Sequence, residues 1–169
     1  VGFASVRDPD FDFADPTKRF FLIILAAIHE YYIGLLKMHI SKAKRQRARA
    51  GLYNASIVPF GYAASGDPQQ PPAIMPKEAE AIRFAYEKYA TGHYSHVEIM
   101  ELLTEAGYRN RQGKRFAKDT VADMLGNPFY MGKVIYRGDH GKAEEILDGL
   151  HEPIVAEELW ESVQRVRAS

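Results

Sequence analysis

Six basic residues and no acidic one lie between Lys37 and Gly51, in a chain whose formal net charge is zero. They are Lys37, Lys42, Lys44, Arg45, Arg47 and Arg49. On a helix, cations at these spacings lie on more than one face and can contact phosphates on both sides of a groove. A solvated surface helix is the alternative, but such helices usually mix Glu among their Lys residues. The segment therefore favours contact with a polyanion, and DNA is the partner we expect.

A second group of basic residues lies between two short predicted helices, at 95–107 and 118–126. Two such helices are typical of a helix-turn-helix-like DNA-binding unit, although this connector is longer than a standard turn. A structural helical bundle therefore stays open as the alternative. The residues expected to serve a major groove are Arg109, Arg111, Lys114, Arg115, Lys118 and Thr120.

The turn from Val58 to Tyr62 is compact and aromatic. It could lie against DNA or fill the hydrophobic core, and packing physics favours the core. Pro59, Phe60 and Tyr62 are kept as candidate DNA contacts, since the first of these interpretations would place them near the same track as the basic helix.

Other kinds of site find little support in the sequence. The chain has no Cys, which excludes disulfides and thiolate metal sites. His93 and His96 form an i, i+3 pair without an evident third ligand. The acidic loop before Pro16 lacks the Gly and the closing Glu of a calcium loop. No nucleophilic triad or phosphate-cradling Gly loop stands out, so we expect no catalytic residue, no metal and no cofactor.

One long helix is predicted to carry the first basic segment. Asp15 and Pro16 form a strong helix start, and Gly51 is a natural stop. The apolar run from Phe20 to Ile28 is only nine residues long. Because a membrane span needs ~20 apolar residues, we interpret the run as a buried helix segment rather than a membrane span.

The front half of this helix carries an apolar stripe at spacings of three and four. Such a surface must be covered by a domain body, by a second copy of the chain, or by both, so we expect self-association here. The candidate oligomer interface comprises Phe21, Ile24, Leu25, Ile28, Tyr32, Leu35 and Leu36.

The fold class predicted is α+β and mainly helical, with a long N-terminal helix followed by a small helical domain that contains a β-hairpin. The predicted organisation is a strand and loop at 1–15, the long helix at 16–50, a linker at 51–75 and a second domain at 76–169. Within that domain we expect helices at 76–91, 95–107, 118–125 and 156–166, and a hairpin of 131–136 with 145–147. Ser95 and Glu98 match a capping box.

Several stretches, taken in order, resemble one family, the large serine recombinases of phages and mobile elements. The resemblance covers nearly the whole chain. The stretches are 11–19 and 24–30, then 49–51 and 59–62, then Glu78-Ala79, Gly107-Tyr108, 120–125, 127–132, 151–154 and 158–161.

The resemblance implies site-specific DNA recombination, such as DNA integration, excision or inversion. In this family a serine attacks the DNA backbone to form a 5′-phosphoserine link, and subunits exchange strands within a tetramer. The long helix would build the dimer and tetramer contacts and then cross the minor groove. The domain after it, the recombinase domain, would bind the flanking DNA. The resemblance also implies a bacterial cytoplasmic protein encoded by a prophage or mobile element.

The sequence departs from this family in three ways. The segment with the nucleophilic serine would precede Val1, so we expect a fragment that does not cleave DNA alone. An acid–arginine pair of small relatives is replaced by Glu30-Tyr31. The Cys-containing zinc ribbon expected after the recombinase domain is absent. A helix-turn-helix-like transcription regulator that dimerises through the long helix is the first alternative. A coiled-coil module is the second, although the apolar stripe fades after Met38 where a coiled coil would continue.

Overall fold

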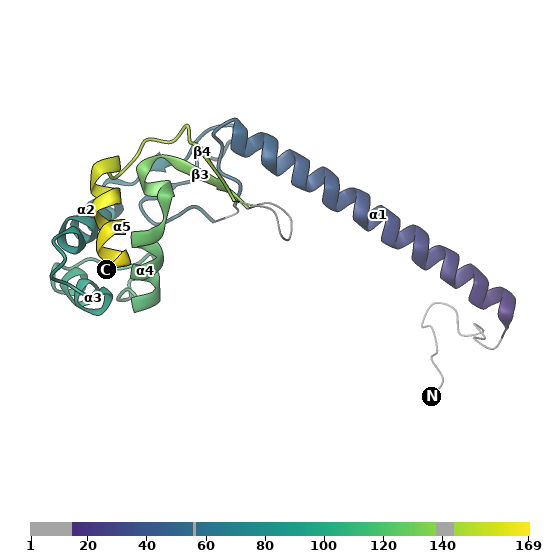
Figure 1. Cartoon of the computed structure of the whole chain (residues 1–169), viewed down its shortest axis with the longest axis horizontal. Helices are drawn as coiled ribbons and strands as arrows, with labels where there is room; N and C mark the ends of the chain where they lie inside the picture. Colours follow the sequence, from purple (N-terminus) through teal and green to yellow (C-terminus); the bar gives the residue numbers. More distant parts are fainter. Residues whose placement is uncertain (1–14, 56, 138–143) are drawn as a thin grey trace. The chain divides into compact units, whose positions relative to one another are not determined.

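The computed structural model describes residues 15–55, 57–137 and 144–169, so the strand and loop predicted before Asp15 lie outside the described ranges. The chain divides into two compact units, with the division after Ala43. This division falls within the long helix, whereas the sequence predicted a boundary at residue 51. Figure 1 shows the order of the helices and strands along the chain.

The long helix α1 spans Pro16–Arg49, as its end signals predicted. At its start the Asp15 carboxylate accepts a hydrogen bond from the Thr17 amide at 2.8 Å, which satisfies one of the unpaired amides of the first turn. At its end Gly51 has a φ of +72°, and the Leu52 amide donates to the Arg47 carbonyl at 2.9 Å. This Schellman-type ending requires the left-handed backbone that Gly adopts readily.

The apolar front half of α1 lies exposed. Phe21 is 59% exposed, Leu25 is 61% exposed and Tyr32 is 65% exposed. The predicted buried segment is therefore wrong for the described part of the chain, because no described residue covers this stretch. By length and composition alone, α1 also meets the criterion for crossing a membrane over an 18-residue window, a weak signal that helices of non-membrane proteins meet as well. The run of nine consecutive apolar residues did not indicate this, because His29 and Glu30 interrupt it.

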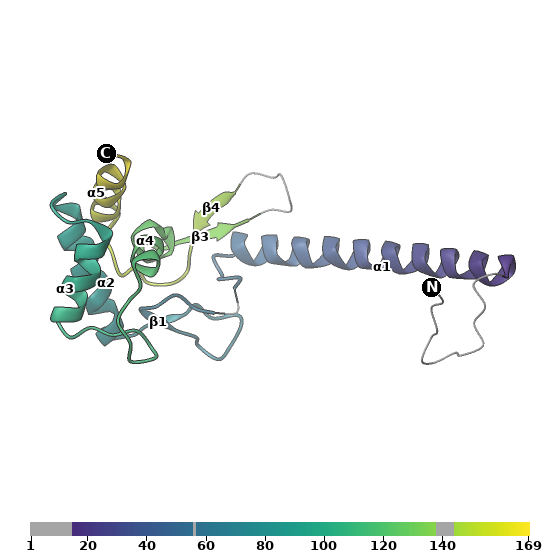
Figure 2. The same cartoon turned by 90° about the horizontal axis from the view of Figure 1, so that it is seen from below.

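The second unit contains α2 (Pro76–Ala90), α3 (His96–Glu105), α4 (Lys118–Gly126), the short 3₁₀ helix η1 (Pro128–Met131) and α5 (Glu157–Ala168). Helix α2 packs against α3 and α5, and α3 packs against α4. These four helices lie together in Figure 2. Their inward faces form a core whose largest fully buried side chains include Ile82, Tyr86, Ile99, Leu103 and Leu125.

Local signals place these helices where the sequence predicted them. Helix α2 begins at Pro76. The Ser95 hydroxyl accepts from the Glu98 amide at 3.3 Å, and the Glu98 carboxylate accepts from the Ser95 amide at 2.7 Å, so the predicted capping box is confirmed. These hydrogen bonds from Ser95 hold the pKa of Glu98 below its ordinary value.

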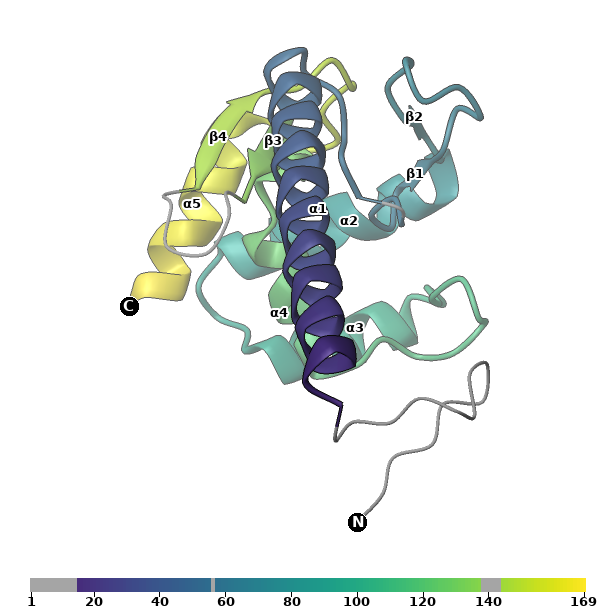
Figure 3. The same cartoon turned by 90° about the vertical axis from the view of Figure 1, so that its right-hand side faces the viewer.

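Two antiparallel two-stranded sheets complete the second unit, at separate places in Figure 3. Strand β3 (Lys133–Tyr136) pairs with β4 (Glu145–Asp148), with Lys133 opposite Asp148, so the predicted hairpin is confirmed. Strand β1 (Tyr62–Ala63) pairs with β2 (Ala73–Ile74), a pairing that the sequence did not predict. It closes the Pro-rich segment 64–72 into a loop whose two ends are joined by backbone hydrogen bonds.

Candidate nucleic-acid interface

The basic end of α1 presents exposed cations, two of which form ion pairs with one carboxylate. Arg45 pairs with Glu145 of β4, and the Nε atom of Arg49 lies 3.8 Å from the same carboxylate. The side chains of Arg45 and Arg49 are 46% and 59% exposed. Lys42 and Lys44 are also exposed. Exposed ion pairs contribute only about 0–1 kcal/mol. A phosphate could therefore replace Glu145 as the partner of both arginines at low cost.

Arg47 has a different role from its basic neighbours. Its guanidinium donates to the Tyr53 carbonyl at 3.2 Å and to the Pro68 carbonyl at 2.8 Å. Ala48, which follows Arg47 in the sequence, is fully buried and marks the face of α1 that packs against the protein. Arg47 therefore fastens the segment after α1 to the helix and has fewer donors left for a phosphate.

Tyr62 lies in the core, which corrects its assignment as a DNA contact. Its side chain is fully buried, and its hydroxyl donates to the Glu152 carbonyl at 2.8 Å. Its ring packs edge-on against Phe129, with the ring centroids 5.0 Å apart. Burial raises the pKa of Tyr62 to about 12. The core interpretation of the aromatic turn is confirmed for this residue.

Pro59 and Phe60 lie beside Tyr62 and are half-buried. The Phe60 ring packs edge-on against Phe116 at a centroid distance of 5.2 Å, and its carbonyl accepts from the Tyr130 hydroxyl at 2.9 Å. The protein's own side chains therefore hold this turn, and it needs no DNA to order it.

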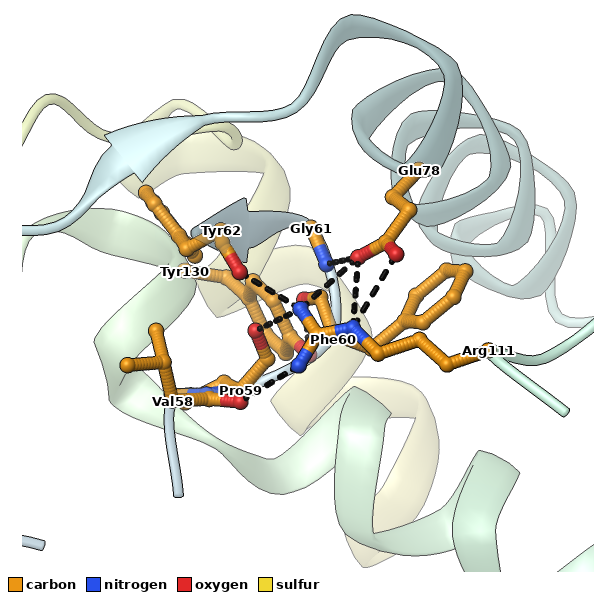
Figure 4. Close-up of polar contacts among 8 residues, drawn as sticks. All are labelled: Val58, Pro59, Phe60, Gly61, Tyr62, Glu78, Arg111 and Tyr130. Carbon is orange, nitrogen blue, oxygen red and sulfur yellow. Dashed lines mark hydrogen bonds and ion pairs between the residues drawn. The ribbon is translucent and has the colours of Figure 1, made fainter. Parts of the chain in front are cut away.

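The guanidinium of Arg111 reaches toward the aromatic turn and Glu78, as Figure 4 shows, although 42% of the side chain is exposed. It forms an ion pair with Glu78 at 2.9 Å, and it donates to the carbonyls of Val58 at 3.1 Å and Pro59 at 3.2 Å. It also donates to the Tyr62 carbonyl. Hydrogen bonding to Glu78 raises the pKa of Arg111. The sequence predicted a major-groove contact for Arg111, which stays a prediction, and the convergence of these acceptors gives its guanidinium partners within the protein.

Glu78 completes this arrangement from the first turn of α2. Its carboxylate also accepts from the Gly61 amide at 2.7 Å. Gly61 has a φ of +98°, and a Cβ there would collide with Ile154, so only Gly fits this close turn. Arg111 and Glu78 therefore clamp three segments together: the aromatic turn, α2 and the basic connector. No local signal in the sequence predicts this clamp, because its two members are 33 residues apart.

The remaining basic residues of the connector lie at the surface. Arg109 donates to the carbonyls of Thr104 and Tyr108, at 2.9 and 2.7 Å, and so caps the end of α3. Lys114, Arg115 and Lys118 are exposed, and none forms an ion pair with the residues that the structure describes. Thr120 is also exposed, in the first turn of α4. Lys114, Arg115, Lys118 and Thr120 remain available to a partner.

Comparison with known proteins identifies the chain at the level of its family. Residues 76–169, more than half of the chain, match the Recombinase family. The chain therefore belongs to the Recombinase family, and the resemblance predicted from the sequence is confirmed, as is the mainly helical α+β fold. No curated protein matches the chain.

Two solved structures are similar to this chain. The first, described as the crystal structure of a complex of LSR (a large serine recombinase) with DNA, is 25% identical with a TM-score of 0.62. The match covers 77% of this chain and 39% of the chain in that structure. The second concerns the sequence requirements of the Listeria innocua prophage attP site and is 24% identical with a TM-score of 0.61. It matches 77% of this chain, which spans 51% of that one, and it supports the fold alone.

Proposed function

We propose that this chain is the DNA-binding segment of a site-specific serine recombinase. The observation that carries the proposal is the exposed, acid-free basic end of α1 in a chain of the Recombinase family. A similar solved structure is described as a complex of LSR with DNA, which is consistent with this role. In the whole protein, recombination would proceed through the 5′-phosphoserine link that the family implies.

On their exposure and their partners within the protein, we divide the candidate residues into contacting and supporting groups. Lys42, Lys44, Arg45 and Arg49 would bind backbone phosphates, with Arg45 and Arg49 exchanging Glu145 for phosphate. Such contacts position the protein on the duplex without reading its sequence. Arg47, Arg111 and Tyr62 would support these surfaces from within the protein.

The connector and the start of α4 would serve the flanking major groove. Lys114, Arg115, Lys118 and Thr120 are exposed on one continuous stretch of chain, and Lys118 and Thr120 lie in the first turn of α4. The N-terminal residues of a recognition helix are those that contact base edges in helix-turn-helix proteins. Sequence specificity would therefore reside here and not in the basic end of α1.

The exposed stripe on the front half of α1 would mediate self-association. Phe21, Leu25 and Leu36 are each about 60% exposed, and a continuous apolar helix face of this kind gains free energy when a second copy covers it. Helices packing in parallel or antiparallel pairs use this spacing of three and four. A dimer built on this surface would place two basic helix ends on one duplex.

The experiment that tests the proposal measures the affinity for duplex DNA against salt concentration. The Arg45→Ala/Arg49→Ala variant should weaken binding to every sequence and lower the salt slope by about one for each phosphate that is no longer neutralised. Arg165→Ala is the matched control, because Arg165 is an exposed arginine on α5 whose partners, Ser162 and Glu161, lie on the same helix. An unchanged slope in the double variant would remove α1 from the interface, and absence of binding at low salt would refute the proposal.

A further inference from the structure

A cleft of about 540 Å³ opens beside α4, and neither the sequence nor the proposed contacts use it. One wall is α4 itself, through Ala122, Asp123 and Gly126. The other walls come from η1, β3, α5 and the segment that follows α1. Its apolar lining residues include Tyr53, Pro128, Phe129 and Ile135.

Basic side chains dominate the charge of this cleft. The basic residues that line the cleft are Lys133 of β3, Arg137 directly after β3, and Arg167 of α5. Asp123 is the acidic residue among the lining residues. Lys133 pairs with Asp148 at 2.8 Å and Arg137 pairs with Glu144 at 3.0 Å. Both acids are well exposed, so a second anion can replace them at low cost, as expected for surface ion pairs.

Arg167 is held in place for an anion more firmly than the other two cations. The Gln164 side-chain amide donates to the Leu125 carbonyl at 2.8 Å, and its oxygen accepts from Arg167 at 2.7 Å. A Cβ on Gly126 would collide with the Arg167 guanidinium, so the absence of a side chain there leaves room for it. No acidic side chain in the described part of the chain forms an ion pair with Arg167, and its other donors can serve a ligand.

The place of the cleft beside α4 indicates which anion it fits. Lys118 and Thr120 begin the helix proposed to enter the major groove, and Ala122 and Gly126 lie further along it, in the cleft. A helix in the major groove is flanked by the sugar-phosphate backbones of the duplex. A backbone bordering that groove offers phosphates to the cations and apolar deoxyribose to the lining of the cleft.

We propose that this cleft binds a stretch of DNA backbone alongside α4, with phosphates on Arg167, Arg137 and Lys133 and a deoxyribose against Ile135 and Tyr53. The inference rests on the proposed DNA-binding function and adds to it a contact surface separate from the basic end of α1. Gln164 and Gly126 act as positioning residues for Arg167.

The test compares Arg167→Gln with Arg165→Gln on duplex DNA over a range of salt concentrations. Removing one phosphate-binding cation should lower the salt slope by about one and the affinity by about fivefold at 0.15 M salt. Arg165 lies two residues away on the same helix and outside the cleft, so its variant should match the wild type. Arg167→Lys, which keeps the charge, should recover most of the slope. An Arg167→Gln slope equal to that of the control would overturn the inference.

A second measurement uses the absence of Cys from the chain. Ala122→Cys places a single thiol in the cleft, and Ala168→Cys places one on α5 outside it. DNA should slow the reaction of a maleimide with the first thiol and leave the second unchanged. Equal rates for Ala122→Cys with and without bound DNA would overturn the inference while the proposed function stands. Failure of the wild type to bind DNA would refute both.

Discussion

Among the basic residues of the connector between α3 and α4, Arg111 should be the one whose replacement by Ala destabilises the second unit most. The change leaves three backbone carbonyls without their charged donor and removes the ion pair with Glu78. Of its hydrogen bonds to described residues, Glu78 keeps the one from the Gly61 amide. The aromatic turn is then no longer linked to the connector, although Tyr62 stays anchored by its buried ring.

The size of the effect follows from the hydrogen bonds and from their exposure. Hydrogen bonds to a charged group contribute about 1.5–3 kcal/mol each when water is excluded. The Arg111 side chain is 42% exposed and that of Glu78 only 13% exposed, so water can replace part of the missing bonding. We therefore expect a decrease of about 2–3 kcal/mol in the free energy of unfolding. Arg111→Lys keeps the charge without the planar fork and should show about half this decrease.

Urea denaturation followed by Trp fluorescence measures this decrease directly. Trp160 on α5 is the single Trp of the chain and packs against the core of the second unit. The midpoint should fall by about 1 M with little change in slope. Arg109→Ala is the matched control, because Arg109 is two residues away and its described hydrogen bonds go to the nearby carbonyls of Thr104 and Tyr108. A double-mutant cycle with Glu78→Gln should show coupling between Arg111 and Glu78.

Two results would refute the clamp. One is an Arg111→Ala midpoint no lower than that of Arg109→Ala. The other concerns DNA, since Arg111→Gln, assayed at a temperature where it remains folded, should keep the wild-type salt slope if Arg111 is structural. A slope lowered by about one in that variant, with stability unchanged, would return Arg111 to the DNA contacts.

Three further predictions concern affinity, pH and assembly. Glu145→Gln removes the competitor for Arg45 and should raise the affinity for DNA up to about fivefold, and weaker binding in a filter or anisotropy assay would contradict this. Burial holds the pKa of His151 below its ordinary value. The unfolded chain therefore takes up the proton first as pH falls through about 6.5. Stability should decrease with falling pH below this point, and His151→Gln should lessen the decrease in urea titrations. The double variant Leu25→Ser/Leu36→Ser should shift the sedimentation of the protein towards that of the monomer. An unchanged sedimentation coefficient would exclude this face of α1 as the self-association interface. Partition of the wild type into neutral lipid vesicles would indicate that the face binds a membrane instead.

The sequence predicted the elements of this protein because their signals are local. Asp15 with Pro16, Ser95 with Glu98, and Gly51 each act on backbone groups within a few residues. Such hydrogen bonds fix where a helix begins and ends before any tertiary contact forms. The hairpin was also predicted, since its two strands are close in the sequence.

Which basic residues remain free for a partner could not be predicted from spacing. Arg45 and Arg111 look alike in the sequence. In the structure Arg45 pairs with Glu145, which is 100 residues away, whereas Arg111 pairs with Glu78. Whether the domain body or another molecule covers the front half of α1 could not be predicted either, because an apolar stripe specifies a face and not what covers it. Helical periodicity carries no information on partners, such as Glu145 or Glu78, that lie far away in the sequence.

The sequence alone determined the family, the positions of the helices and the segregation of charge at the end of α1. Tertiary structure alone decided that Arg111 pairs with Glu78 and that Arg167 joins Lys133 in a cleft beside α4. The reason is physical: caps and periodicity act over one or two turns of helix, whereas ion pairs and clefts depend on which distant carbonyls, carboxylates and side chains folding brings within a few ångströms.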